Sequence, residues 1–152
     1  IIAVTRMKEI KRVFMYHGAE HKTVYCHEND EELTVENCMK YPVMHPRCGT
    51  AFLLIVMIIS ILVTSAAGVF GLDNNWLTRI LIRLALLPVV AGVSYEVLQY
   101  LGKHDTPVTR VLRWPGMQLQ RLTTAEPDDS MLEVAIRALE LVIPEEKGKD
   151  AW

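Results

Sequence analysis

The stretch most suited to chemistry is a His-Gly-Ala-Glu-His run at residues 17–21. In a helix, positions three and four apart share a face, so His17, Glu20 and His21 are expected to point in similar directions. Two imidazoles one turn apart can bind a divalent metal, and a carboxylate beside them can act as a general base on water. The order H-x-x-E-H is that of the inverted zinc-protease signature. We therefore predict His17 and His21 as metal ligands and Glu20 as a catalytic base.

Further candidate residues lie at two other places in the chain. His45 and Cys48 are separated by two residues, a spacing that can share a metal, and Arg47 between them suits a carboxylate or a substrate oxygen. Glu96 lies in an otherwise apolar stretch, where a carboxylate is costly and marks a functional-site candidate. We predict His45, Cys48 and Glu96 as further metal ligands and Arg47 as a catalytic residue. The alternatives are a structural turn with a buried Cys48, and Glu96 as a hydrogen-bond acceptor for a neighbouring helix.

The H-x-x-E-H run belongs to a helix predicted over residues 5–25. Its apolar stripe is expected to face the core, while Lys22 lies off it; the stripe comprises Ile10, Val13, Phe14, His17, His21 and Val24. A buried imidazole needs either a hydrogen bond or a metal, so a buried hydrogen-bond network is the alternative to metal binding. The acidic residues 27–32 are predicted as a solvated loop, and Thr34 as the N-cap of a short helix that ends before Pro42.

Two apolar stretches dominate the middle of the chain. Residues 51–72 carry no charge, and residues 77–101 carry only Arg79, Arg83 and Glu96. Each is long enough to cross the hydrocarbon core of a bilayer, which takes about 20 residues. We predict an all-α membrane protein with a transmembrane helical hairpin over 51–72 and 77–101, flanked by amphipathic helices. The competing interpretation is a buried hairpin in a soluble all-helical protein.

The flanking segments carry most of the Lys and Arg residues, so both flanks are predicted to be cytoplasmic. The whole of 1–152 is taken as one domain, with a cytoplasmic segment at 5–50, the hairpin at 51–101, interfacial and C-terminal helices at 102–143, and a tail at 144–152. Pro115 and Gly116 are expected to break the interfacial segment, and Glu126 and Pro127 to cap and open the last helix. The apolar start at Ile1 indicates a fragment of a longer chain.

The composition of the chain limits the classes of binding partner that we expect. The net charge of −2 gives no reason to expect nucleic acid, and three widely spaced cysteines do not form a disulfide framework. The predicted partner is the lipid bilayer, with a homo-oligomer as a further expectation and the substrate undetermined.

Several separate blocks of the sequence resemble the YqhQ-like family. They are residues 12–14, 16–23, 33–37, 45–50, 94–96, 122–129 and 133–136. The family comprises bacterial membrane proteins of unknown function, often described as predicted metal-dependent enzymes, with further apolar segments before the matching region. The resemblance implies a multi-pass protein of the bacterial inner (cytoplasmic) membrane, but it supplies no reaction.

Three functions are compatible with these residues. The first is a zinc-dependent hydrolase at the cytoplasmic membrane face, in which His17 and His21 bind the metal, Glu20 activates water, and Glu96, Cys48 or His45 completes the site. The second is a closed structural metal site in a scaffold or assembly protein. The third is a component of a transporter that uses Glu96 as an intramembrane ligand.

Overall fold

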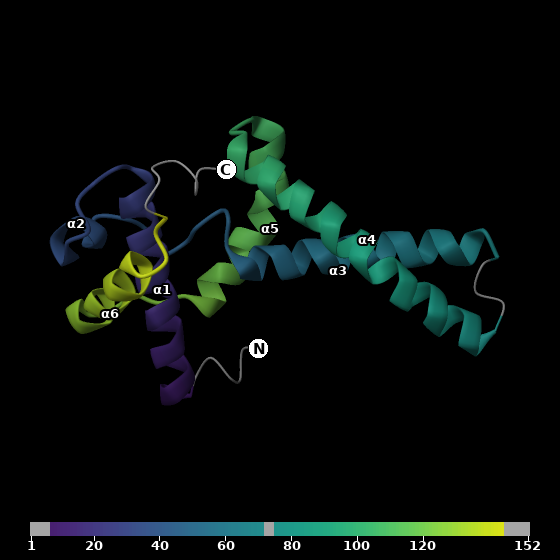
Figure 1. Ribbon diagram of the computed structural model, residues 1–152, viewed down its shortest axis with the longest axis horizontal. Coiled ribbons are helices and arrows are strands. Elements are labelled where there is room, and N and C mark those ends of the chain that lie inside the picture. The colour runs from purple at the N-terminus through teal and green to yellow at the C-terminus, as the bar shows by residue number, and fades with distance from the viewer. Residues whose placement is uncertain (1–6, 72–74, 145–152) are drawn as a thin grey trace. The chain divides into compact units, whose positions relative to one another are not determined.

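The computed structural model describes residues 7–71 and 75–144, and within these ranges the chain is entirely helical, without a strand. The predicted all-α class is therefore confirmed. Part of the predicted tail (145–152) and residues 72–74 of the turn between the apolar stretches lie outside the described residues. The helices are α1 (Lys8–Glu28), α2 (Val35–Met39), α3 (Gly49–Val69), α4 (Trp76–Lys103), α5 (Pro107–Thr123) and α6 (Asp129–Glu140) (Figure 1).

The chain divides into two compact units, and each is described by itself. The first unit comprises residues 1–45 and 117–152, and the second comprises residues 46–116. The first unit contains α1, α2 and α6, whereas the second contains the hairpin of α3 and α4 together with the first part of α5.

The core of the first unit lies where α1 packs against α6 and α2. It is built from small side chains of α1 and α2 and larger ones of α6: Ala19, Cys26, Cys38, Met131, Leu132 and Ile136. The predicted orientation of α1 is wrong in part, because the buried face runs through Gly18, Ala19 and Cys26, while Val13 of the predicted stripe is 58% exposed. Small residues of α1 occupy the core positions because they let the helices approach closely.

Side-chain caps fix the ends of the short helices of the first unit. Thr34 Oγ1 accepts a hydrogen bond from the Asn37 amide, so the predicted N-cap of α2 is confirmed. The N-cap of α6 is Asp128 and not Glu126 as predicted. The Asp128 carboxylate accepts a hydrogen bond from the Met131 amide. Pro127 consequently stands before the cap instead of in the first turn. Asp128 accepts from the Ser130 hydroxyl and the Met131 amide, and both hydrogen bonds lower its pKa.

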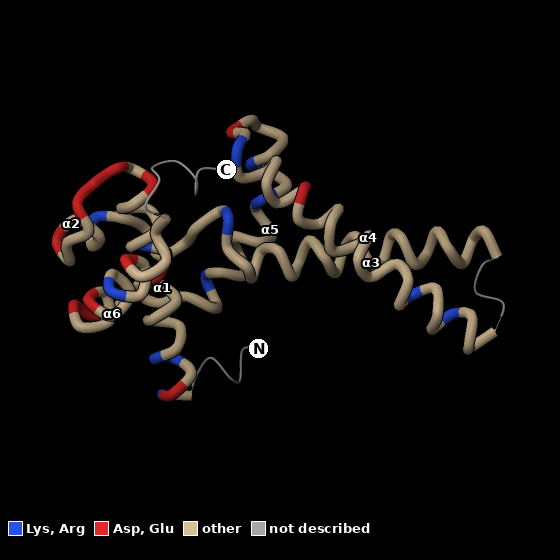
Figure 2. Tube along the Cα trace, in the orientation of Figure 1, with Lys and Arg blue, Asp and Glu red and all other residues tan. Residues whose placement is uncertain are grey.

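The second unit is built on the antiparallel pair α3 and α4. The buried residues of the two helices are small or medium in size, among them Ala51 and Ala67 of α3 and Val90, Ser94 and Leu98 of α4. Both helices are long and apolar enough to cross a membrane, and α3 carries no charged residue (Figure 2). The predicted pair of apolar helices is thus confirmed, although α3 begins at Gly49 and ends at Val69, and α4 runs from Trp76 to Lys103.

The predicted break at Pro115 and Gly116 is wrong, because α5 continues through both residues. Proline removes one backbone hydrogen bond, but a neighbouring contact supports the segment. A side chain at Gly116 would press against Ala51 of α3, so the missing side chain allows the two helices to pack closely within the second unit.

Candidate metal centre

The two histidines of the H-x-x-E-H run lie one turn apart on α1, as predicted. Their ring centroids are 4.4 Å apart, and the rings meet edge to face. His21 is 5% exposed, and His17 is half-buried. The spacing of the helix therefore brings two imidazoles side by side at the border of the first unit’s interior.

Both imidazoles are oriented by backbone carbonyls from distant parts of the chain. His17 Nδ1 lies 2.8 Å from the Thr123 carbonyl oxygen, and His21 Nδ1 lies 2.6 Å from the Val43 carbonyl oxygen. A carbonyl oxygen only accepts, so each Nδ1 carries the proton and donates it. In the neutral ring the lone pair then resides on Nε2, which is the arrangement found in metal-ligating histidines.

Gly18 explains how the carbonyl-bearing segments come so close to α1. A Cβ at this position would overlap the Ala125 carbonyl oxygen and would stand 3.3 Å from Val43 Cγ1. The Ala125 amide donates to the Phe14 carbonyl at 2.9 Å, which fixes the segment after α5 against the helix. The residue between His17 and Ala19 therefore has to lack a side chain.

His45 joins the same cluster through its backbone and its ring. The buried Gln120 side chain holds the backbone of His45, accepting from its amide and donating to its carbonyl, each at 2.8 Å. The ring centroid of His45 lies 5.8 Å from that of His21 and 4.3 Å from that of Tyr25. His45 Nε2 is 3.2 Å from a carboxylate oxygen of Glu28, so Glu28 belongs to this cluster and not to the predicted solvated loop.

Glu20 occupies a different face of α1 from the two histidines. It is exposed and lines a groove of about 320 Å³ between α1 and α6. The remaining lining is mostly apolar, with Tyr16, Thr23, Val24, Val134, Ala135, Ala138, Leu139 and Val142. The carboxylate therefore faces a space that could hold a small apolar group, while its catalytic role stays a prediction.

Lys22 is a buried cation that the sequence placed on the solvent side. It is 4% exposed, and its ammonium donates to the carbonyls of Tyr41 at 2.6 Å and Met39 at 3.1 Å. The Glu126 carboxylate lies 3.1 Å from the same nitrogen, so Glu126 is an ion-pair partner and not a cap. Lys22 thus ties residues 39–41 to α1, two residues before the carbonyl that orients His21. The hydrophobic periodicity of the sequence does not predict a buried Lys22, because a lysine normally extends its charge into water.

Two thiols of the first unit are buried beside each other in the core. Cys26 and Cys38 are fully buried, and Cys26 Sγ donates to the Glu32 carbonyl at 3.4 Å. Burial and the neighbouring Cys38 thiol raise the pKa of Cys26 to about 12. Cys26 is therefore a protonated core side chain at neutral pH, which makes it a poor metal ligand.

The other predicted site residues belong to the second unit. Cys48 is the N-cap of α3, and its Sγ accepts from the Thr50 amide at 3.4 Å, which agrees with the alternative of a structural turn. The aliphatic part of Arg47 packs over Gly102, where a Cβ would stand 2.7 Å from Arg47 Cγ. Glu96 is exposed on α4, two positions from the buried Ser94 and hence on the opposite side of that helix.

Sequence comparisons place the chain among proteins whose activity is not described. Residues 1–145 match the family described as “Protein of unknown function (DUF1385)”. Over 130 residues the chain is 46% identical to the uncharacterized protein YqhQ of Bacillus subtilis (strain 168), a match that covers 85% of this chain and 40% of that relative. The chain thus spans less than half the length of this curated relative. No solved structure matches it. These matches describe no metal-dependent enzyme, so that part of the predicted resemblance finds no support in them. The family itself is confirmed, and the chain belongs to the DUF1385 family of YqhQ-like proteins.

Proposed function

We propose that the chain is a membrane-anchored metal-binding protein in which Nε2 of His17 and Nε2 of His21 bind one divalent cation. The observation that carries the proposal is the pair of hydrogen bonds from Nδ1 to backbone carbonyls, which set the same tautomer in two neighbouring rings. Neutral imidazoles suit zinc, copper, iron or nickel, whereas magnesium and calcium prefer oxygen ligands.

Cys48 is the third ligand in this proposal. The backbone of His45 is fixed beside the histidine pair by Gln120, and Cys48 follows three residues later in the chain. Three extended residues span about 11 Å at most, so the chain allows the thiolate to reach the two imidazoles. Two imidazoles and one thiolate favour zinc, and three protein ligands leave one coordination position for water or substrate.

The hairpin of α3 and α4 indicates where in the cell the proposed metal site lies. Its two helices can cross a membrane, and Lys and Arg are concentrated on both flanks. Positive residues favour the cytoplasmic side, so we place both flanks, and with them the metal site, at the cytoplasmic face of the inner membrane.

The catalytic part of the proposal is hydrolysis with Glu20 as the general base. Its exposed carboxylate lines the groove between α1 and α6, on a different face of α1 from the two histidines, so this part of the proposal rests on the H-x-x-E-H order of the sequence and not on the geometry of the site. Bound zinc would supply Lewis-acid activation of the substrate, and Arg47 would polarise the same oxygen. Replacing Glu20 by Gln should therefore retain metal and abolish hydrolysis; retained turnover would overturn this part of the proposal.

A structural metal site is the second candidate, and one observation favours it. The two carbonyls that orient the imidazoles come from residues 43 and 123, so a metal on α1 would stabilise contacts among three separate segments. In that case metal removal lowers the melting temperature of the protein, and X-ray absorption spectra show four protein ligands with no water.

Metal content tests both candidates together. We expect roughly one zinc per purified full chain and a loss of most of it in His21→Ala. His104→Ala is the matched control, because His104 is exposed in the second unit. A wild-type protein purified without metal, or an unchanged metal content in His21→Ala, would overturn the proposal.

A further inference from the structure

The first part of α5 presents an uncovered apolar face in the second unit. Val108, Val111, Leu112 and Trp114 are 67%, 71%, 59% and 62% exposed. On the other side of the helix Thr109 is 2% exposed and Gly116 packs against Ala51. An amphipathic helix whose apolar side faces outward marks an interaction surface.

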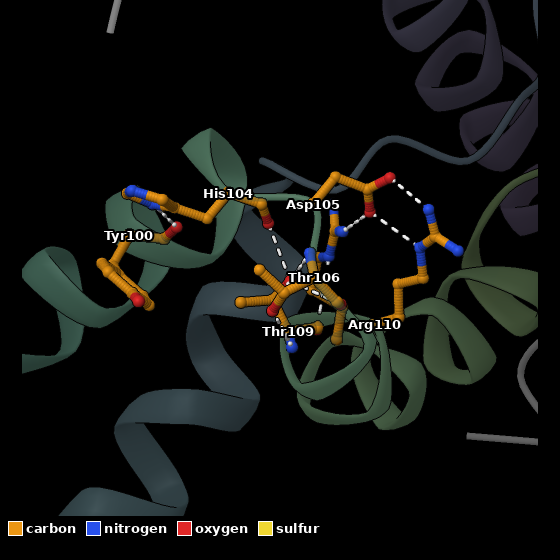
Figure 3. Close-up of polar contacts among 7 residues, drawn as sticks. Tyr100, His104, Asp105, Thr106, Thr109 and Arg110 are labelled. Carbon is orange, nitrogen blue, oxygen red and sulfur yellow. Dashed lines mark hydrogen bonds and ion pairs between the residues drawn. The ribbon is translucent and has the colours of Figure 1, made fainter.

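The connection between α4 and α5 fixes where this face lies along the second unit. Thr109 Oγ1 donates to the His104 carbonyl at 2.7 Å, and the Thr106 amide donates to Thr109 Oγ1 at 2.9 Å (Figure 3). The turn between Lys103 and Pro107 is therefore short and internally bonded. Since α4 is long and apolar enough to cross a membrane, α5 begins within about 14 Å of the end of a possible span.

The same junction carries an excess of positive charge that a single carboxylate partly neutralises. Asp105 accepts from Arg110 Nε at 2.9 Å (Figure 3). It also accepts from Arg113 Nη2 at 2.7 Å. Hydrogen bonding from Arg110, with a smaller contribution from Arg113, lowers the pKa of Asp105 to about 2, so the carboxylate stays charged at physiological pH. Lys103 adds a third cation, which leaves the junction net positive.

We infer that residues 107–116 lie in the headgroup layer of a membrane and bind the phosphate groups of anionic lipids. Tryptophan and arginine flanking an apolar helix face are typical of this layer, and anionic headgroups attract basic residues next to a span. Arg110 and Lys103 are exposed cations of the junction, the Arg110 side chain to 67%, and Asp105 is the intramolecular anion with which a lipid phosphate competes for Arg110. This membrane contact does not depend on the proposed metal site.

The position of α5 is tested with the full chain in lipid nanodiscs. Trp76→Phe and Trp152→Phe leave Trp114 as the only tryptophan of residues 1–152, and its emission is excited selectively over that of tyrosine. We expect a blue-shifted emission that is quenched by lipids brominated near the headgroup and is protected from iodide in solution. Quenching by iodide alone would overturn the inference. Protection that occurs only in discs holding two copies would also overturn it, since the face would then be a dimer contact.

Lipid charge is tested with spin-labelled lipids in the same discs. The wild type should favour phosphatidylglycerol over phosphatidylcholine, Arg110→Gln should reduce that preference about fivefold, and Asp105→Asn should increase it by a similar factor. Arg137→Gln is the matched control, because Arg137 is also exposed and ion-paired, with Glu140 of the first unit. Equal association of both lipids, or equal changes in all three variants, would contradict the assignment. Metal content at His17 and His21 should be the same throughout, which separates this test from that of the metal site.

Discussion

The two units of the chain differ in the polar side chains that they bury and in the apolar side chains that they expose. In the first unit the buried positions include the polar residues His21, Lys22, His45 and Gln120. In the second unit large apolar side chains are exposed along both long helices, among them Leu53 (66%), Ile61 (57%) and Leu87 (58%). The first unit therefore follows the rule for water-soluble proteins that buried polar groups are paired, whereas the second has the apolar exterior expected of a protein in lipid.

This contrast indicates what each unit depends on. Among the described residues every buried side-chain nitrogen or oxygen has a hydrogen-bond partner, and most of those partners in the first unit are backbone carbonyls at defined positions. Single substitutions there should disturb specific contacts. The second unit buries little of its surface, so its stability should depend on the surrounding medium more than on any one internal contact.

The largest expected effect comes from placing a charge on the exposed face of α3. Ile61 lies near the middle of that helix, and Ile61→Lys should cost about 3 kcal/mol of membrane insertion if lipid covers this face. Val69→Lys at the 85% exposed end of the helix is the control, because a terminal lysine can reach the interface. The measurement is the fraction of chain integrated into membrane vesicles during cell-free synthesis. Equal integration of both variants would break the comparison between the units.

The next effect concerns the close approach at α1. Gly18→Ala should lower the free energy of unfolding by about 2–3 kcal/mol, because the new methyl group meets a backbone carbonyl that cannot rotate away. It should also displace the carbonyls that orient His17 and His21, and so weaken metal binding. Gly92→Ala in α4 is the control, since its new side chain meets no atom within 4 Å and should be neutral or stabilising. Thermal unfolding in one detergent compares the pair, and equal melting temperatures would argue against the tight contact.

A smaller effect is expected from removing the buried cation. Lys22→Met leaves the Met39 and Tyr41 carbonyls without their donor and should cost about 2 kcal/mol of unfolding free energy. Lys40→Met should change stability by less than about 0.5 kcal/mol, because Lys40 is exposed and its ammonium donates to the side chain of Asn37 at the surface. Chemical denaturation monitored by circular dichroism would measure both. Similar losses of unfolding free energy in the two variants would show that the buried ammonium of Lys22 does not stabilise the fold more than an exposed one.

Sequence patterns predicted the elements of this chain better than their contacts. Helical content, the two apolar helices and the Thr34 cap followed from local rules about periodicity, charge and capping. The pairing of His17 with His21 also followed, because helical spacing alone brings them together. Each of these features depends on residues close to one another in the sequence.

Long-range partners could not be predicted in the same way. The carbonyls that receive the two histidine Nδ1 protons belong to residues 43 and 123, and a backbone carbonyl leaves no mark in the sequence. The roles of Lys22 and Gln120 likewise depend on segments brought together by packing. Gly18 was the one available signal, since a glycine between two site residues of a helix has to be explained by a close neighbour. Its meaning becomes clear only once the Ala125 carbonyl is located.

The smallest expected effect on stability comes from the ionisation of the Cys26 thiol in the interior of the first unit. Its pKa is raised from 9.0 to about 12 by burial and by Cys38, so the fold stabilises the protonated thiol. That contribution to stability is complete below pH 9 and is lost as pH rises towards 12, where the unfolded chain has already released the proton. At pH 8 the thiolate fraction of Cys26 should therefore be far lower than that of an exposed thiol. Native-state alkylation with iodoacetamide, followed by mass spectrometry, should leave Cys26 unmodified until urea unfolds the protein. Equal labelling rates in native buffer and in urea would instead indicate that water reaches this core in the folded protein. The first unit would then not have the closed interior that distinguishes it from the lipid-dependent second unit.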